Sequence, residues 1–219
     1  MSYEIWDENY DINGYELNIL EHSLLPEYRW QESRLSPDGC DARSYGRLAK
    51  IRDNLDDFFS IDKNNLVICG ENLGCGKTSW AIKMMLTYIE QNAHRLAGYS
   101  REEIEHNFDI TMFISTVPFL VDIKQFSDNK EAQKIYQRAK TCELVVFDDI
   151  AAVNMSSYDY NIIYAIVETR VLAHYPSIFT TNCTSEEELR KTLGPRLADR
   201  IWNTSTVIEL KGKGFRGSK

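Results

Sequence analysis

The sequence contains no stretch that approaches the roughly 20 consecutive apolar residues needed to cross a bilayer. Its first residues, MSYEIWDENYD, lack the basic and then apolar order of a signal peptide. The five cysteines are odd in number and never spaced as Cys-x-x-Cys, which indicates neither a disulfide framework nor a zinc knuckle. We therefore expect a soluble, cytoplasmic protein with reduced and mostly packed thiols.

Lys and Arg are absent from residues 1–28, which hold seven acidic residues. The last nine residues have the opposite bias, with four basic residues and no acidic one, and the net charge of the 219-residue chain is -8. Non-specific binding to duplex DNA depends mainly on many cations that neutralise phosphates. A general role in coating duplex DNA is therefore not expected, while local contacts with nucleic acid remain open.

Short apolar runs alternate with segments of helical periodicity after about residue 45. Strands are predicted at 64–70, 109–116, 141–150, 177–182 and 205–212, and helices at 77–91, 116–126, 129–140, 156–175, 184–194 and 195–203. A chain of this length can bury one good core. The alternation predicts an α/β fold with a parallel sheet covered on both faces and a ligand at the carboxyl ends of the strands.

The stretch GENLGCGKTS, which begins at Gly70, is typical of a loop that binds nucleotide phosphates. Its glycines let successive N–H groups point at phosphate oxygens, and the following helix adds its positive end. A lysine in this position reaches the β- and γ-phosphates, and the threonine hydroxyl ligates magnesium. The residues predicted to bind the cofactor are Gly74, Cys75, Gly76, Lys77, Thr78 and Ser79, with Thr78 also a metal ligand.

Glu71 departs from the usual signature, which has a glycine at that position. Gly70 stands one residue earlier, so the loop can be one residue longer, with Glu71 turned to solvent at the exit of the strand. A carboxylate aimed at the phosphates would weaken binding. We therefore expect weak nucleotide binding by a lone monomer.

Two acids follow the predicted strand in LVVFDDI, and an asparagine follows the next strand in FTTN. Asp148 is suited to hold magnesium, and Asp149 to orient and polarise the attacking water. Asn182 can hold that water or the γ-phosphate; alone, it would be interpreted as a turn or cap residue. Arg196, Arg200 and Arg216 are harder to place, since surface salt bridging explains any single arginine.

Taken in order, GCGKT, LVVFDDI, FTTN, LGPRLADRI and GFR resemble the helicase-loader branch of the AAA+ ATPases, the DnaC and DnaI proteins, and their relative IstB. The resemblance covers about residues 24–217. It implies a P-loop NTPase with a five-stranded parallel sheet in the order 5-1-4-3-2. The implied roles are Walker A for Lys77 and Thr78, Walker B for Asp148 and Asp149, sensor 1 for Asn182, arginine finger for Arg200 and sensor 2 for Arg216.

The same resemblance implies that ATP and Mg²⁺ bind between adjacent subunits. It also implies self-association into a ring or spiral on a DnaB-type replicative helicase, which is loaded onto single-stranded DNA. The helical segment after the second strand is then expected to contact DNA through Phe119, Lys124 and Phe126, although apolar packing explains Phe119 equally well.

Compared with cellular members of that branch, the chain has a short N-terminal segment and little or no C-terminal helical lid, which fits a compact phage or mobile-element version. Residues 1–25 are expected to form an acidic extension, and residues 26–219 the ATPase domain. Leu17, Leu20 and Leu24 lie on one helical stripe, so the extension is either a helicase-docking segment or a flexible acidic tail.

Three other functions remain open from the sequence. An IstB-like transposition ATPase would bind duplex DNA, and the modest charge of the core argues against it. A P-loop kinase would phosphorylate a small acceptor, although no internal arginine-rich lid is apparent. A nucleotide-sensing adaptor would hydrolyse nothing, which leaves Asp149 without a role.

Overall fold

A computed structural model describes residues 14–30, 35, 41–96, 99, 109–125, 130–152 and 155–212 of the chain. Its helices and strands are α1 (Gly14–His22), η1 (Glu27–Arg29), α2 (Ala42–Arg52), α3 (Leu55–Phe59), β1 (Asn65–Cys69), α4 (Lys77–Asn92), η2 (Ala93–Leu96), β2 (Thr111–Ser115), α6 (Thr116–Gln125), α7 (Lys130–Thr141), β3 (Leu144–Asp148), α8 (Ser157–Leu172), β4 (Ser177–Thr181), α9 (Glu186–Leu193), α10 (Pro195–Asn203) and β5 (Ser205–Glu209). Within this part of the chain, no helix is long and apolar enough to cross a membrane.

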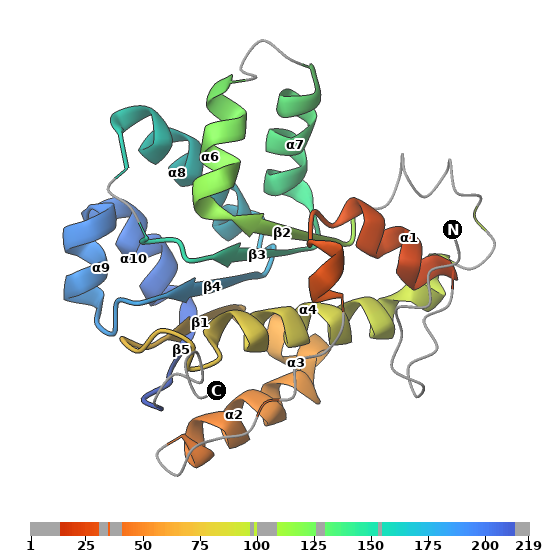
Figure 1. The fold of residues 1–219 in the computed structure, drawn as a ribbon, viewed down its shortest axis with the longest axis horizontal. Helices are drawn as coiled ribbons and strands as arrows, with labels where there is room; N and C mark the ends of the chain where they lie inside the picture. Colours follow the sequence, from red (N-terminus) through yellow and green to blue (C-terminus); the bar gives the residue numbers. More distant parts are fainter. Residues whose placement is uncertain are drawn as a thin grey trace.

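The five described strands form one parallel sheet in the order β2-β3-β4-β1-β5. This is the predicted order 5-1-4-3-2, taken from the opposite edge. β1 lies between β4 and β5 (Figure 1), and every residue of β1 is buried. Because all the strands run the same way, the carboxyl ends of β1, β3 and β4 lie at one edge of the sheet.

Alternate residues of each strand face two separate cores. In β1, Leu66 and Ile68 belong to a first core cluster, which includes residues of α1, α2 and α4. Val67 and Cys69 belong to a second core cluster, which includes residues of α6, α8, α9 and α10. This twofold alternation along a strand places helices on both faces of the sheet, as predicted (Figure 1).

Two helices near the start of the chain, α2 and α3, are not anticipated by the periodicity analysis, whereas α1 contains Leu17 and Leu20 of the predicted helical stripe. α2 and α3 precede β1, and α2 contributes two buried side chains, Tyr45 and Leu48. α1 packs Ile19 and Leu20 into the first core cluster, whereas Leu24 of the predicted stripe is 43% exposed. A helicase-docking role for residues 1–25 stays a prediction, and residues 1–13 lie outside the described part.

Arg170 of α8 forms hydrogen bonds at the amino-terminal edge of the sheet, where β3 and β4 begin. Its guanidinium donates hydrogen bonds to the carbonyl groups of Cys142 (2.7 Å) and Pro176 (2.6 Å) and to the Ser177 hydroxyl (2.9 Å). The side chain is 1% exposed, and burial lowers its pKa to about 10. The guanidinium therefore satisfies buried backbone acceptors that would otherwise be costly.

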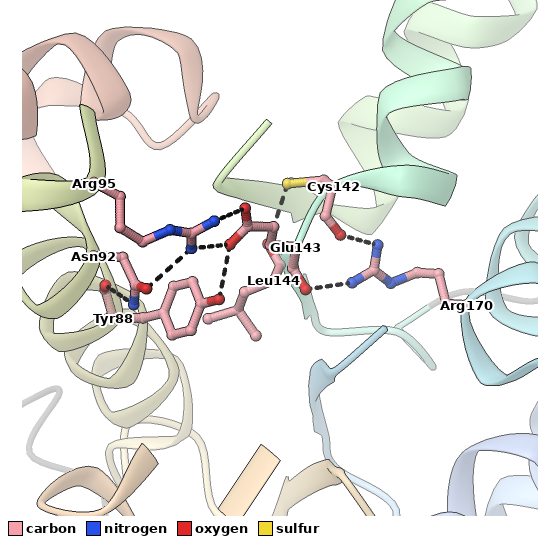
Figure 2. A network of polar contacts seen from close by, with 7 residues as sticks. All are labelled: Tyr88, Asn92, Arg95, Cys142, Glu143, Leu144 and Arg170. Carbon is pink, nitrogen blue, oxygen red and sulfur yellow. Dashed lines mark hydrogen bonds and ion pairs between the residues drawn. The ribbon is translucent and has the colours of Figure 1, made fainter. Parts of the chain in front are cut away.

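Glu143, just before β3, joins this arginine to α4. Its carboxylate accepts hydrogen bonds from the Tyr88 hydroxyl (3.0 Å) and from two guanidinium nitrogens of Arg95 (2.7 and 2.8 Å), while its backbone carbonyl accepts one from Arg170 (Figure 2). The network links both helical layers at the edge opposite the carboxyl ends of the strands. We assign it a structural role.

The four described cysteines are free, and Cys69, Cys75 and Cys142 are buried. Burial raises the pKa of the Cys69 and Cys142 thiols to about 12. The expectation of packed thiols is confirmed for these three, and their reduced state stays a prediction. Cys183 is half-buried, and Cys40 lies outside the described residues.

Candidate nucleotide-binding site

The loop between β1 and α4 has the backbone conformation that a phosphate-binding loop needs. Gly74 and Gly76 adopt φ angles of 77° and 103°, in the left-handed region that favours glycine. A β-carbon on Gly76 would also lie 3.0 Å from the Tyr45 hydroxyl oxygen. α4 begins directly after Gly76, so the N–H groups of its first turn are free of helical partners and face the loop.

The packing of β1 against the end of β5 requires a glycine at position 70. A β-carbon there would lie 2.2 Å from the Leu210 carbonyl oxygen, which is too close for any other residue without a backbone shift. The next residue, Glu71, is exposed. The expectation that Glu71 turns to solvent is confirmed, while its effect on nucleotide affinity stays a prediction.

Lys77 is held against the loop by backbone carbonyl groups. Its Nζ donates hydrogen bonds to the carbonyl oxygens of Gly70 (2.7 Å) and Asn72 (3.0 Å), and the residue is 9% exposed. The ammonium group therefore lies inside the curl of the loop, where a lysine that binds phosphates is required.

Asp148 and Thr78 form the pair that could hold a metal ion. The Thr78 hydroxyl donates a 2.8 Å hydrogen bond to Oδ1 of Asp148, which is 9% exposed at the end of β3. A hydroxyl and a carboxylate side by side fit Mg²⁺, which keeps several waters and takes few protein ligands. The described residues contain no cluster of three or more His, Cys, Asp or Glu that could hold a metal ion.

Thr180 organises both acids and was missed by the sequence analysis. Its hydroxyl donates a 2.7 Å hydrogen bond to Oδ1 of Asp148 and accepts a 2.8 Å bond from the backbone N–H of Asp149. The only signal for it is its place two residues before Asn182 in FTTN. Because it lies on the neighbouring strand, its role depends on the pairing of β3 with β4.

Asp149 is held in an unusual backbone conformation, with a φ angle of 56°. The following N–H, of Ile150, donates to the Thr180 carbonyl, so β4 fixes both ends of this turn. Partial desolvation, and then the negative charge of Asp148, raise the pKa of the Asp149 carboxyl, although Lys77 opposes them. A strained backbone and a shifted pKa are both common at functional sites.

These groups surround one cavity of about 340 Å³ at the carboxyl ends of β1, β3 and β4. It brings together most of the predicted site residues and adds three that were not predicted. The lining residues are Arg29, Leu73, Gly74, Gly76, Lys77, Thr78, Ser79, Asp148, Asp149, Thr180 and Asn182.

Cys75 and Arg200 are predicted site residues that do not line this cavity. The Cys75 side chain is buried beneath the loop. Any contact of Cys75 with a phosphate is therefore made by its backbone N–H. Arg200 of α10 pairs with Glu168 of α8, at 2.5 and 3.1 Å. A role of Arg200 in a neighbouring subunit stays a prediction, and Arg216 lies outside the described residues.

The predicted DNA contacts on α6 are wrong in one respect. Phe119 is 6% exposed and packs in the second core cluster, so it is not available for base stacking. Lys124 pairs with Asp159 of α8 at 2.7 Å. Phe126 lies outside the described residues. Apolar packing, the alternative explanation for Phe119, is the arrangement observed.

No protein-family model and no curated protein sequence matches this chain. Among solved structures, the crystal structure of the DnaC helicase loader matches with a TM-score of 0.65 at 17% identity, over 85% of this chain and 100% of that chain. The crystal structure of DnaI matches with a TM-score of 0.60 at 17% identity, over 87% of this chain and 94% of that chain.

A third structure is the replication initiator DnaA bound to AMPPCP and single-stranded DNA. It matches with a TM-score of 0.59 at 16% identity, over 87% of this chain and 51% of that chain. At such identities the comparisons establish the fold. The chain therefore has the fold of the DnaC, DnaI and DnaA structures, and its parallel sheet has the predicted strand order.

Proposed function

We propose that this chain hydrolyses ATP with Mg²⁺ and uses the energy to load a DnaB-type replicative helicase onto single-stranded DNA. The observation that carries the ATPase proposal is the grouping of Lys77, Thr78, Asp148, Asp149 and Asn182 around one cavity. A phosphate loop, a metal-binding pair and a water-polarising acid are the parts that ATP hydrolysis needs.

Each group has a distinct part in this proposal. The loop N–H groups and Lys77 bind the β- and γ-phosphates, and Mg²⁺ held by Thr78 and Asp148 would neutralise charge on them. Asp149 orients a water molecule toward the γ-phosphorus, with Asn182 as a second hydrogen-bonding group. The water oxygen bonds to phosphorus, the bond to the ADP oxygen breaks, and the water proton leaves through Asp149 or the released phosphate.

The loader proposal is supported by the structures with the same fold. One is the DnaC helicase loader, and another is the replication initiator DnaA bound to AMPPCP and single-stranded DNA. In this proposal the chains assemble on the helicase, ATP lies between neighbours, and Arg200 of one chain acts on the ATP of the next. For this role, Arg200 either breaks its ion pair with Glu168 or contacts the ATP of the neighbouring chain while the ion pair remains.

Light scattering after size-exclusion chromatography tests the loader proposal. The full chain, a DnaB-type hexamer from the same genome or host, and a non-hydrolysable ATP analogue are mixed. We expect a complex whose mass exceeds that of the hexamer by several copies of this chain. Lys77→Ala should weaken the complex, whereas the surface substitution Lys191→Ala should not. A folded chain that never co-elutes with the hexamer would count against the proposal.

A further inference from the structure

We infer that Arg29 is a phosphate-binding residue that contacts the terminal phosphate of ATP within its own chain. This inference rests on the proposed ATPase function. Arg29 belongs to η1, 48 positions before Lys77 in the sequence, yet both line the same cavity. Among the described residues that line the cavity, Arg29 and Lys77 are the two cations.

The cavity itself indicates which part of a nucleotide Arg29 meets. The described residues of its lining include the phosphate loop, the two acids and Asn182, and none of those described is an aromatic residue that could stack on a base. Asp149 and Asn182 follow β3 and β4, on the side where the attacking water is expected. A ligand group in this cavity is therefore the triphosphate end of ATP, and Arg29, a lining cation from outside the phosphate loop, meets its last phosphate.

The backbone of Arg29 is fixed before any ligand binds. Its N–H donates to the Pro26 carbonyl (2.8 Å), and the next residue, Trp30, is buried and donates from its indole nitrogen to the Leu25 carbonyl (2.8 Å). Further back, the Ser23 carbonyl accepts a 2.7 Å bond from the N–H of Phe113 in β2. Such anchoring reduces the entropy that is lost when the side chain binds a ligand.

The guanidinium of Arg29 is free to take an anion. Its partner among the described residues is the adjacent Tyr28, whose hydroxyl accepts a 3.3 Å hydrogen bond from Nε of Arg29. The guanidinium carbon also lies 5.6 Å from the centre of the Tyr28 ring, and Tyr28 is 80% exposed. Other arginines are committed to carboxylates: Arg95 to Glu143, Arg138 to Asp109 and Arg200 to Glu168. Among the described residues, Arg29 has no such ion pair, and a guanidinium suits two-point binding of phosphate oxygens.

Equilibrium titration of the full chain with two nucleotides tests this inference. Mg-ADP lacks the terminal phosphate, and the Mg complex of β,γ-methylene ATP retains it. We expect Arg29→Ala to weaken binding of the ATP analogue about tenfold, or about 1.4 kcal/mol. Binding of Mg-ADP should change less than about twofold, and Arg29→Lys should recover part of the loss. Arg52→Ala, which removes an arginine paired with Asp53 outside the cavity, is the matched control.

The outcomes separate the inference from the proposed function. If the wild-type chain binds both nucleotides and Arg29→Ala leaves their affinity ratio unchanged, the inference is overturned while the ATPase proposal stands. The same holds if both affinities fall equally. If a folded wild-type chain, alone or with the helicase, binds neither nucleotide, the ATPase proposal fails and the inference fails with it.

Discussion

The hydroxyl group of Thr78, in the first turn of α4, donates a 2.8 Å hydrogen bond to Oδ1 of Asp148 at the end of β3. The two side chains come from segments 70 residues apart and meet where the phosphate loop opens into the cavity. Both oxygens can therefore ligate the same ion without a change of fold. This contact links the phosphate loop to the acidic residues of the site.

Substitution of Thr78 by alanine should reduce Mg-dependent ATP turnover by at least about tenfold, equivalent to 1.4 kcal/mol in the barrier. The reason is the loss of one oxygen ligand to Mg²⁺. Binding of ATP in EDTA should change little, because no metal is present in that experiment. Turnover at saturating ATP and titrations with and without Mg²⁺ provide the measurement. An equal loss with and without Mg²⁺ would show that Thr78 binds phosphate and not the metal.

Asp149 should control the acidic side of the pH profile of hydrolysis. Only its carboxylate form can accept the water proton, so activity is present above its pKa and lost as the pH falls through it. Since desolvation and Asp148 raise that pKa, the loss should begin at a higher pH than for an ordinary aspartate near 3.9.

Asp149→Asn should lower turnover by about 10²–10⁴-fold and remove this acidic limb, while nucleotide affinity is kept. Turnover between pH 4.5 and 8 for both chains gives the comparison, with circular dichroism at each pH to confirm that they are folded. An unchanged limb in the variant would mean that another group titrates.

Arg200→Ala should abolish turnover in the assembled complex, by roughly 10³-fold, if it acts as an arginine finger on a neighbour. Nucleotide binding by the isolated monomer should stay nearly intact, because Arg200 does not line the cavity of its own chain. Stability should fall by less than about 1 kcal/mol, since the ion pair with Glu168 is partly exposed. If monomer binding collapses instead, Arg200 acts within its own chain and the shared site is excluded.

Arg170→Met should destabilise the fold by about 3 kcal/mol, because the carbonyl groups of Cys142 and Pro176 lose a buried donor. For a domain of this size the melting temperature should fall by about 6–12 °C. The affinity of the folded variant for Mg-ATP should not change, as the network lies at the opposite edge of the sheet. Arg52→Met, which removes an exposed arginine, should melt within about 3 °C of the wild type.

The sheet order and most of the site could be predicted because their signals are local or follow from the motif order. Apolar runs identified all five described strands, and the residues after β1, β3 and β4 had to meet at one edge. Glycine, lysine, paired acids and asparagine are the residue types that phosphate chemistry needs. Their grouping in one cavity follows from the parallel sheet.

The parts that escaped prediction depend on contacts between distant segments. α2 carries four basic residues among eleven and buries only Tyr45 and Leu48, so it lacks the apolar run that identified the other elements. The role of Thr180 requires the pairing of Phe147 with Phe179, which no local pattern contains. Arg29 lines the cavity in a segment that a hydrogen bond from the Phe113 N–H to the Ser23 carbonyl holds against β2, and no local pattern contains that contact. The prediction that Phe119 stacks on a DNA base failed because the sequence does not distinguish an aromatic residue in the core from one on the surface.

Helicase loading on circular single-stranded DNA tests the central claim most directly. A closed DnaB-type hexamer cannot thread onto a circle, so its stable retention there reports that the ring was opened. The wild-type chain with ATP should place the hexamer on the circle, whereas Lys77→Ala should not, although it remains folded. Equal retention of the hexamer with the wild-type chain, with Lys77→Ala and with no added chain would contradict the account.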